Sequence, residues 1–341
     1  MQSENSKRNG ARRTQAIAAL WAAVVIAGVS AWPAKAAPFA YVADGGDDVS
    51  VIDTATNSVV ASVPVAGDAR GLAVTPDGKY VYVTNSDADS VSVINTASNV
   101  ATGNIQVERF PFWVALTPDG KRAYVSNFNS NSVSVIDTRA QKVIATVQVG
   151  TRPAGLAISP DGKRVYVANI ASVEVSVINT VDNSIVATIP LGPANGGGSP
   201  QVAGSTLVVV SPDGKHAYVG QPAVSVVDTA SNTVVANVSG VSGPFGMAIT
   251  PDGKRVYVGN TLSQTVSVID TTTNAVVATV TGLHGPTGIA VTQDGKSVYV
   301  ADQNSASGSG FVSVINTATN SVVATVKVKR APFGVAIGPS P

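Results

Sequence analysis

Val91-Ser92-Val93-Ile94-Asn95-Thr96 decides the fold, because close copies of this hexapeptide recur along the whole chain. The copies begin at Val49, Val91, Val133, Val175, Val224, Val266 and Val312. Successive copies are 42, 42, 42, 49, 42 and 46 residues apart. Seven copies at such a period indicate a repeat architecture, in which each repeat is one supersecondary unit.

A second repeated element, Pro-Asp-Gly followed by Lys, predicts a tight turn in the units that carry it. It begins at Pro76, Pro118, Pro160, Pro212 and Pro251, and in altered form at Gln293. Between the repeated elements, apolar and polar residues alternate with period two, which is typical of short strands. In the second unit we expect strands at 71–75, 80–84, 91–94 and 100–107, and no segment has a helical period.

Four short antiparallel strands in each unit predict the blade of a β-propeller. The chain starts on the second strand of a blade, Phe39 to Ala43, and finishes on the first strand of one, Phe333 to Ile337. If these segments pair, no sheet edge is left open where the ring closes. We therefore predict an all-β, seven-bladed β-propeller closed by pairing of N-terminal and C-terminal strands in one blade; an open arc is the alternative.

Tyr82-Val83-Thr84-Asn85 spells the signature of the YVTN repeat family, which this chain resembles over almost its whole length after residue 36. Variants of the signature begin at Tyr41, Tyr124, Tyr166, Tyr218, Tyr257 and Tyr299. The resemblance implies a propeller of the surface-layer or periplasmic kind. Related seven-bladed folds include lactonases and nitrous oxide reductase domains, so the resemblance implies a fold more strongly than an activity.

Residues 1–36 have the three parts of a signal peptide. Basic residues at positions 7, 8, 12 and 13 precede an apolar run from Ala16 to Trp32, and Ala34-Lys35-Ala36 fits a cleavage site. The run is marginal for spanning a bilayer, although an uncleaved anchor is the alternative. We expect cleavage after Ala36, by either general or twin-arginine export, and one propeller domain over residues 37–341. Its expected location is the periplasm, the cell surface or the medium.

The charge balance argues against a generally basic nucleic-acid binder. The chain has a net charge of +1, but residues 1–36 hold five basic residues and one acidic residue, so the remainder has a net charge of −3. Cysteine is absent, which excludes disulfides and thiol chemistry. Stability must therefore come from burial of the core.

The loops sort onto two faces of the predicted ring, and those on one face vary from blade to blade. Variable loops on a rigid scaffold commonly carry binding residues. Basic residues lie in four successive inter-blade loops, and aromatic residues lie beside the innermost strands near the expected central channel, with Trp113 close by. The predicted binding residues are Arg70, Arg109, Phe110, Phe112, Arg152, Phe245, His284, Arg330 and Phe333, with Lys329 in the same basic arc.

Basic and aromatic groups together could bind an anionic small molecule, an anionic macromolecule or single-stranded DNA. The alternative is that the aromatic residues pack between blades and the arginines keep the rim soluble. Acidic residues also gather in these loops, where a solvated acidic rim is favoured over a Ca²⁺ site. They are Asp44, Asp47, Asp48, Asp87, Asp89 and Asp302. The glycine-rich stretch 192–200 is interpreted as a flexible insertion rather than a ligand lid.

Two histidines, His216 and His284, are too few for a multi-histidine metal cluster, and we expect no cofactor. No G-x-S-x-G nucleophile motif with a strand-to-helix context is present. The favoured interpretation is a monomeric, non-enzymatic binding or scaffold module that contacts cell-envelope components. The alternative is a lactonase-like hydrolase acting on a lactone or sugar ester through His284, an acid and Arg70.

Overall fold

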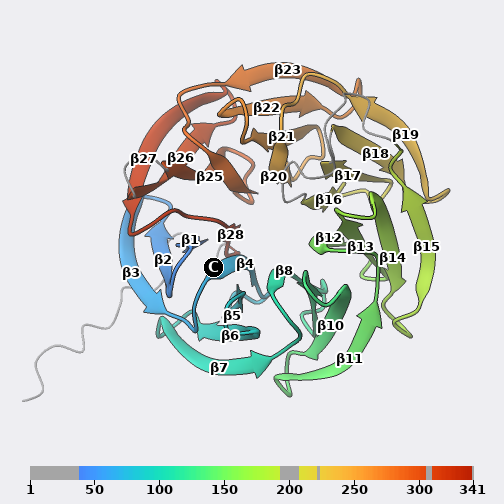
Figure 1. Ribbon diagram of the computed structural model, residues 1–341. Coiled ribbons are helices and arrows are strands. Elements are labelled where there is room, and N and C mark those ends of the chain that lie inside the picture. Colours follow the sequence, from blue (N-terminus) through green and yellow to red (C-terminus); the bar gives the residue numbers. More distant parts are fainter. Residues whose placement is uncertain (1–37, 193–206, 221–222, 305–308, 340–341) are drawn as a thin grey trace, which may run out of the picture. The chain divides into compact units, whose positions relative to one another are not determined.

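The computed structural model describes residues 38–192, 207–220, 223–304 and 309–339. These residues form 28 β-strands and no helix, and the strands assemble into seven four-stranded antiparallel sheets. The sheets follow one another around a ring, each with one strand nearest the centre (Figure 1). The prediction of an all-β, seven-bladed β-propeller is confirmed. The signal peptide predicted for residues 1–36 lies outside the described residues.

Six blades consist of four consecutive strands that run from the innermost to the outermost position, and blade 1 takes its innermost strand from the C-terminus. Blade 1 contains β28 (Val335–Ile337), β1 (Phe39–Ala43), β2 (Asp48–Asp53) and β3 (Ser58–Pro64); blade 2 contains β4 (Ala69–Val74), β5 (Tyr80–Asn85), β6 (Ser90–Asn95) and β7 (Val100–Gln106); blade 3 contains β8 (Pro111–Leu116), β9 (Arg122–Asn127), β10 (Ser132–Asp137) and β11 (Lys142–Gln148). Blade 4 contains β12 (Pro153–Ile158), β13 (Arg164–Asn169), β14 (Glu174–Asn179) and β15 (Ile185–Pro190); blade 5 contains β16 (Val208–Val210), β17 (His216–Gly220), β18 (Val224–Asp228) and β19 (Thr233–Val238). Blade 6 contains β20 (Pro244–Ile249), β21 (Arg255–Asn260), β22 (Thr265–Asp270) and β23 (Ala275–Val280); blade 7 contains β24 (Pro286–Val291), β25 (Ser297–Asn304), β26 (Ser309–Asn316) and β27 (Ser321–Val328). The strands predicted in the second unit agree with blade 2 to within two residues.

The ring closes in blade 1, where β28 pairs with β1 in antiparallel register. Val42 is opposite Val335 and Ala40 is opposite Ile337. Hydrogen bonds extend the pairing beyond β28, because Phe333 N donates to Ala43 O over 2.7 Å. The predicted closure is confirmed, although the C-terminal strand is shorter than the predicted segment from Phe333 to Ile337.

The two repeated motifs bond to each other inside each of several blades. Asn85 of the YVTN signature donates from Nδ2 to Ser92 Oγ of the hexapeptide over 2.9 Å, and both residues are buried. The same bond recurs from Asn127 to Ser134, from Asn169 to Ser176 and from Asn260 to Ser267. A buried amide needs such a partner, since leaving it unpaired costs about 1–3 kcal/mol. The motif serine and asparagine are thus one structural unit.

Hydrogen bonds on the face with the Pro-Asp-Gly turns connect neighbouring blades. Arg255 donates from Nη1 to Thr317 O over 3.0 Å, and Arg164 donates to Thr229 O over 2.7 Å. The buried signature tyrosines reach in the same direction: Tyr257 Oη donates to Asn320 Oδ1 over 2.9 Å. These bonds fix the position of each blade relative to the next.

The Pro-Asp-Gly turns are held by their own side chains. In blade 2, Thr75 Oγ1 donates to Asp77 Oδ1 over 2.7 Å, and Lys79 N donates to the same oxygen over 3.1 Å. These hydrogen bonds lower the pKa of the Asp77 carboxyl below its ordinary value. Gly78 takes a φ of 70°, which a glycine adopts without strain.

The outermost strands of all seven blades contain a β-bulge at the same position, opposite the isoleucine or valine of the hexapeptide. In blade 6 the irregularity lies between Val268 and Ile269, and the extra residue Val277 is 55% exposed. A bulge interrupts the regular row of backbone donors and acceptors along a free edge. Bulged edges discourage a second strand from pairing with them.

Candidate functional site

Three phenylalanines occupy equivalent positions at the start of innermost strands and meet at the centre of the ring. Phe112 of blade 3 and Phe333 of blade 1 have ring centroids 5.4 Å apart, in an edge-to-face arrangement. Phe245 of blade 6 lies 5.2 Å from Phe333 in the same kind of arrangement. Edge-to-face pairs add about 0.5–1.5 kcal/mol to the burial of the rings. The three rings therefore form an apolar centre beside the variable loops.

Glycines allow the innermost strands to come this close. A Cβ atom added to Gly246 would lie 1.7 Å from Thr287 O of the next blade. A Cβ at Gly334 would lie 2.2 Å from Arg70 O. Blade 3 has Trp113 at the equivalent position, and the indole packs partly against the blade 3 to blade 4 core. The residue that precedes each glycine is the one that reaches the centre of the ring.

Arg70 occupies this equivalent position in blade 2, and its guanidinium lies over the phenylalanine rings. Its Cζ is 4.9 Å from the centroid of Phe110, 5.0 Å from Phe333 and 5.6 Å from Phe112. Asp68 accepts a hydrogen bond from Arg70 Nε over 2.7 Å. Among the described residues, no acceptor is recorded for the two Nη groups. The side chain is 24% exposed, so these groups can reach a ligand.

Phe128, in the loop between β9 and β10, extends this group of rings towards blade 4. Its centroid lies 5.7 Å from Phe112 and 5.8 Å from Phe110, and Arg152 Cζ lies 5.7 Å from its ring. We call the group of Arg70, Phe110, Phe112, Phe128, Arg152, Phe245 and Phe333 the axial cluster. Six of its seven members were predicted as binding residues, and Phe128 was not.

Two members of the axial cluster have a backbone conformation that is unusual for their residue type. Phe110 has a φ of 56° and Arg152 a φ of 55°, and blade 6 has Gly243 at the equivalent position. Most other non-glycine residues with positive φ in the described chain are Asn, Asp or Gln. Such a conformation costs on the order of 1 kcal/mol or more, and residues that keep it cluster at functional sites.

The remaining predicted residues lie elsewhere. Arg109 is exposed, and its backbone N donates to Ser130 Oγ over 3.0 Å. Arg330 is exposed next to Gly46, and its neighbour Lys329 forms an ion pair with Asp48 at 2.9 Å. No contact of Arg109 or Arg330 with the axial cluster is recorded in the described residues. The basic arc of the sequence does not converge on one point.

His284 forms a separate pair with Asp302 in blade 7. The Nδ1 atom of His284 lies 3.4 Å from Asp302 Oδ2, and the imidazole is 55% exposed whereas the carboxylate is 2% exposed. Asp302 Oδ1 accepts from His284 N over 2.7 Å and from Gly285 N over 2.8 Å. The Asp302 carboxylate therefore fixes the loop that carries His284, and it orients the imidazole ring through Nδ1.

The prediction of a solvated acidic rim is wrong for two of the aspartates. Asp44 and Asp302 are each 1% exposed, because they stand where the signature has Asn85 and therefore point into the blade. Ser50 Oγ donates to Asp44 Oδ2 over 2.6 Å, but Asp44 Oδ1 has no hydrogen-bond partner in the part of the chain that the structure describes. Burial raises the pKa of Asp44 to about 7. Within the described residues no three acidic, histidine or cysteine side chains are grouped to hold a metal ion.

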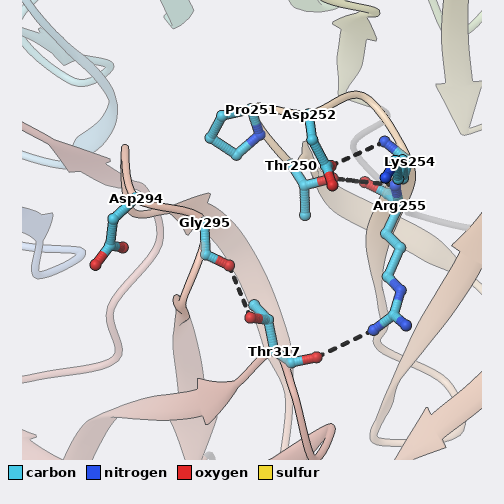
Figure 2. A pocket seen from close by; sticks show the side chains of 8 residues that line it. All are labelled: Thr250, Pro251, Asp252, Lys254, Arg255, Asp294, Gly295 and Thr317. Atoms are coloured by element: carbon cyan, nitrogen blue, oxygen red, sulfur yellow. Dashed lines mark hydrogen bonds between the residues drawn. The ribbon is translucent and has the colours of Figure 1, made fainter.

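Two clefts of the described chain lie on the opposite face, between neighbouring Pro-Asp-Gly turns. The one between blades 6 and 7 has a volume of about 320 Å³ and is lined by Thr250, Asp252, Arg255, Asp294 and Thr317 among others (Figure 2). Dashed lines in Figure 2 show that Arg255 and Asp252 are already bonded within the protein. A similar cleft of about 280 Å³ lies between blades 2 and 3. These clefts repeat with the blades and follow from blade packing, so we place the candidate site at the axial cluster.

The fold and the axial cluster define a seven-bladed β-propeller with a basic and aromatic centre on its variable face. Two family models match parts of the chain: a YNCE-like β-propeller matches residues 218–305, and a seven-bladed lactonase β-propeller matches residues 96–186. The lactonase match includes Phe110, Phe112, Phe128 and Arg152 but neither Arg70 nor His284. No curated protein sequence matches the chain significantly.

Solved structures of other propellers are similar to this chain. Hydrazine synthase of Kuenenia stuttgartiensis is 26% identical with a TM-score of 0.68, over 80% of this chain and 90% of that one. A protein of unknown function from Desulfotomaculum acetoxidans DSM 771 is 19% identical with a TM-score of 0.74, over 89% and 99%. The dihydro-heme d1 dehydrogenase NirN is 14% identical with a TM-score of 0.63, over 89% and 75%. These likenesses establish the propeller fold.

In the described residues no helix is long and apolar enough to cross a membrane.

Proposed function

We propose that this protein is an exported, non-enzymatic binding and scaffold module that takes an anionic ligand at the axial cluster. The observation that carries the proposal is the placement of Arg70 over three phenylalanine rings, with no acceptor for its two Nη groups among the residues that the structure describes. The basic start, apolar run and small-residue cleavage pattern of residues 1–36 support export to the periplasm or the cell surface.

The surroundings of Arg70 favour an anion with an apolar body. A guanidinium on aromatic faces is partly removed from water, so its hydrogen bonds to an anion are stronger than those of a fully solvated arginine. Half-buried Phe110, Phe128 and Phe333 offer rings on which an apolar or aromatic group can rest.

The ligand panel that tests the proposal contains organic carboxylates, organic phosphates and a single-stranded oligonucleotide at several salt concentrations. We expect at least one anion to bind, and Arg70→Ala to weaken that binding at least tenfold. Arg109→Ala is the matched control, because the Arg109 side chain is exposed and forms no ion pair or cation–π contact with the cluster within the described residues. Absence of binding to every member, or equal binding by the Arg70→Ala variant, would contradict the proposal. A nucleic-acid ligand would also show a steep loss of affinity with salt.

A lactonase-like hydrolase is the second candidate, and the His284–Asp302 pair is the observation that favours it. A buried carboxylate beside one imidazole nitrogen orients a histidine and leaves the other nitrogen able to accept a proton from water. An ester or lactone held near this pair would meet an oriented general base. In the described residues, Arg70 contacts Asp68 and the phenylalanine rings, whereas His284 contacts Asp302.

Turnover of a panel of lactones and sugar esters separates the two candidates. If the hydrolase proposal holds, His284→Ala lowers kcat by at least a hundredfold, which is the smaller end of a general-base effect. Asp302→Asn should also lower kcat, because the imidazole loses its oriented tautomer. Turnover that survives His284→Ala unchanged rejects the role of His284, and absence of turnover rejects the hydrolase.

A further inference from the structure

The axial cluster lies among more acidic than basic side chains. In the loops on the same face of blades 1–4, the acidic residues outside the blade core are Asp47, Asp48, Asp68, Asp87, Asp89, Glu108 and Glu174. The basic residues there are Arg70, Arg109, Arg152, Lys329 and Arg330. A polyphosphate backbone would bring many negative charges into this region. Salt only partly screens the repulsion between its phosphates and nearby carboxylates.

Two of the five basic residues are already paired within the protein. Asp68 binds Arg70 at 2.7 Å, and Asp48 binds Lys329 at 2.9 Å. The side chains of the first pair are 24% and 20% exposed, so that pair is partly shielded from water. The local field at Arg70 is therefore weak, and the site can compensate one negative charge better than several.

Asp68 engages one side of the guanidinium and leaves the other side available. It accepts from Nε, and the aromatic rings of Phe110, Phe112 and Phe333 hold the plane of the group. Asp68 has a φ of 44°, a backbone conformation that the equivalent residues Phe110 and Arg152 share. The Nη1 and Nη2 groups can then donate a parallel pair of hydrogen bonds, which suits the two oxygens of a carboxylate.

We propose that the axial cluster binds a single carboxylate carried on a planar apolar body, and that Asp68 positions Arg70 for it. This inference rests on the proposed anion-binding function and narrows its ligand class to organic monocarboxylates. The carboxylate accepts from both Nη groups of Arg70, and the planar body rests on the half-buried rings of Phe110, Phe128 or Phe333. Single-stranded DNA is excluded by the same charge arrangement.

The test compares three probes by titration of the purified protein at physiological ionic strength: 2-naphthoate, its neutral analogue 2-naphthalenemethanol, and an oligothymidylate. We expect 2-naphthoate to bind with a Kd on the order of 1 mM or below, as ligand size and a shallow site allow. The alcohol should bind at least tenfold more weakly, and the oligonucleotide should not bind. Naphthalene-2,6-dicarboxylate should bind more weakly than the monocarboxylate.

Variants of Asp68 separate a positioning role from a simple charge effect. Asp68→Asn keeps an oxygen that can accept from Nε and removes a negative charge, so 2-naphthoate should bind as tightly as before or a few-fold more tightly. Asp68→Ala removes the acceptor as well, and should weaken binding at least threefold although it makes the site more positive. Equal binding by both variants overturns the positioning role. Unchanged melting temperatures confirm that both variants are folded.

The outcomes for this inference and for the proposed function differ. If the oligonucleotide binds and 2-naphthoate does not, anion binding stands and the monocarboxylate class is wrong. If the alcohol binds as tightly as 2-naphthoate, the aromatic rings alone hold the probe and the role of Arg70 is wrong. If no member of the wider anion panel binds, both the inference and the proposed function fail.

Discussion

Each repeat contributes to two regions of the molecule. One is the framework, made of the Pro-Asp-Gly turns and the strands, and the other is the set of variable loops. The two regions use polar side chains differently. In the framework, Asp77 bonds within its own turn and Arg255 bonds to the next blade. In the loops, equivalent positions share a positive φ but hold the unrelated side chains of Asp68, Phe110 and Arg152. Repetition in a propeller therefore indicates a structural role, and departure from it indicates where a specific function could lie.

The largest effect is expected at Gly246, where the framework permits no side chain. Gly246→Ala would place a Cβ 1.7 Å from the backbone oxygen of Thr287, so two innermost strands would have to separate. We expect a loss of about 3–5 kcal/mol in the free energy of unfolding, measured by chemical denaturation.

Gly282 in a variable loop provides the matched control for Gly246. A Cβ there meets nothing within 4 Å, and only the φ of 85° opposes it. Gly282→Ala should therefore cost only about 1 kcal/mol. Equal losses for the two variants would show that framework and loops tolerate side chains alike, which would break the comparison.

A smaller effect is expected when arginines of the two regions are exchanged for alanine. Arg255→Ala removes the 3.0 Å bond to Thr317 O and leaves that carbonyl without its donor, which should cost about 1–2 kcal/mol. Arg109→Ala on the variable face should change the free energy of unfolding by less than about 0.5 kcal/mol. Thermal or urea unfolding of both variants measures the difference. A larger loss for Arg109→Ala than for Arg255→Ala would contradict the structural role of the face with the Pro-Asp-Gly turns.

A gain in stability is expected at Asp44, where blade 1 has an aspartate in place of the asparagine found in blades 2, 3, 4 and 6. Burial raises the pKa of Asp44 from 3.8 to about 7 in the folded protein. The folded state therefore binds a proton that the unfolded state releases, so stability falls as pH rises from about 4 to about 7 and stays low above that. One pKa unit corresponds to about 1.4 kcal/mol, so Asp44→Asn should raise stability by a few kcal/mol at pH 8 and should have little effect at pH 4.

Melting temperatures of the wild type and the Asp44→Asn variant at pH 5 and pH 8 check this sign. The gain should be larger at pH 8, and the wild type should lose more stability than the variant between the two pH values. A gain of the same size at both pH values would mean that the added Nδ2 donor, rather than the buried charge, is responsible.

The fold was predictable because its determinants repeat. The hexapeptide and the YVTN signature mark the two middle strands of each blade, and the ends of the chain mark the closure between β1 and β28. The burial of Asp44 was also within reach of the sequence, since it aligns with Asn85 in the signature. It was missed because aspartate is common in turns, and the loop was given more weight than the alignment.

The candidate site was only partly predictable, because it depends on loops that do not repeat. Phe112, Phe245 and Phe333 were placed correctly since they occupy one position of the repeat. Arg109 and Arg330 were assigned to the same site from their chain positions, but the repeat does not determine the direction of a side chain in an inter-blade loop. Phe128 follows Asn127 of the signature, and a large apolar residue directly after the signature was the signal that could have found it.

The closure of blade 1 sets an order of events during synthesis. Strands β1 to β3 leave the ribosome first, yet β1 gains its inner neighbour only when Val335–Ile337 has been made. Until then the N-terminal strands keep an unpaired edge, while blades 2 to 7 each contain all four strands in consecutive order. Blade 1, whose strands β1 to β3 are made first, is thus the last blade to be completed. Loss of β28 would leave β1 without its inner neighbour and the ring open at blade 1.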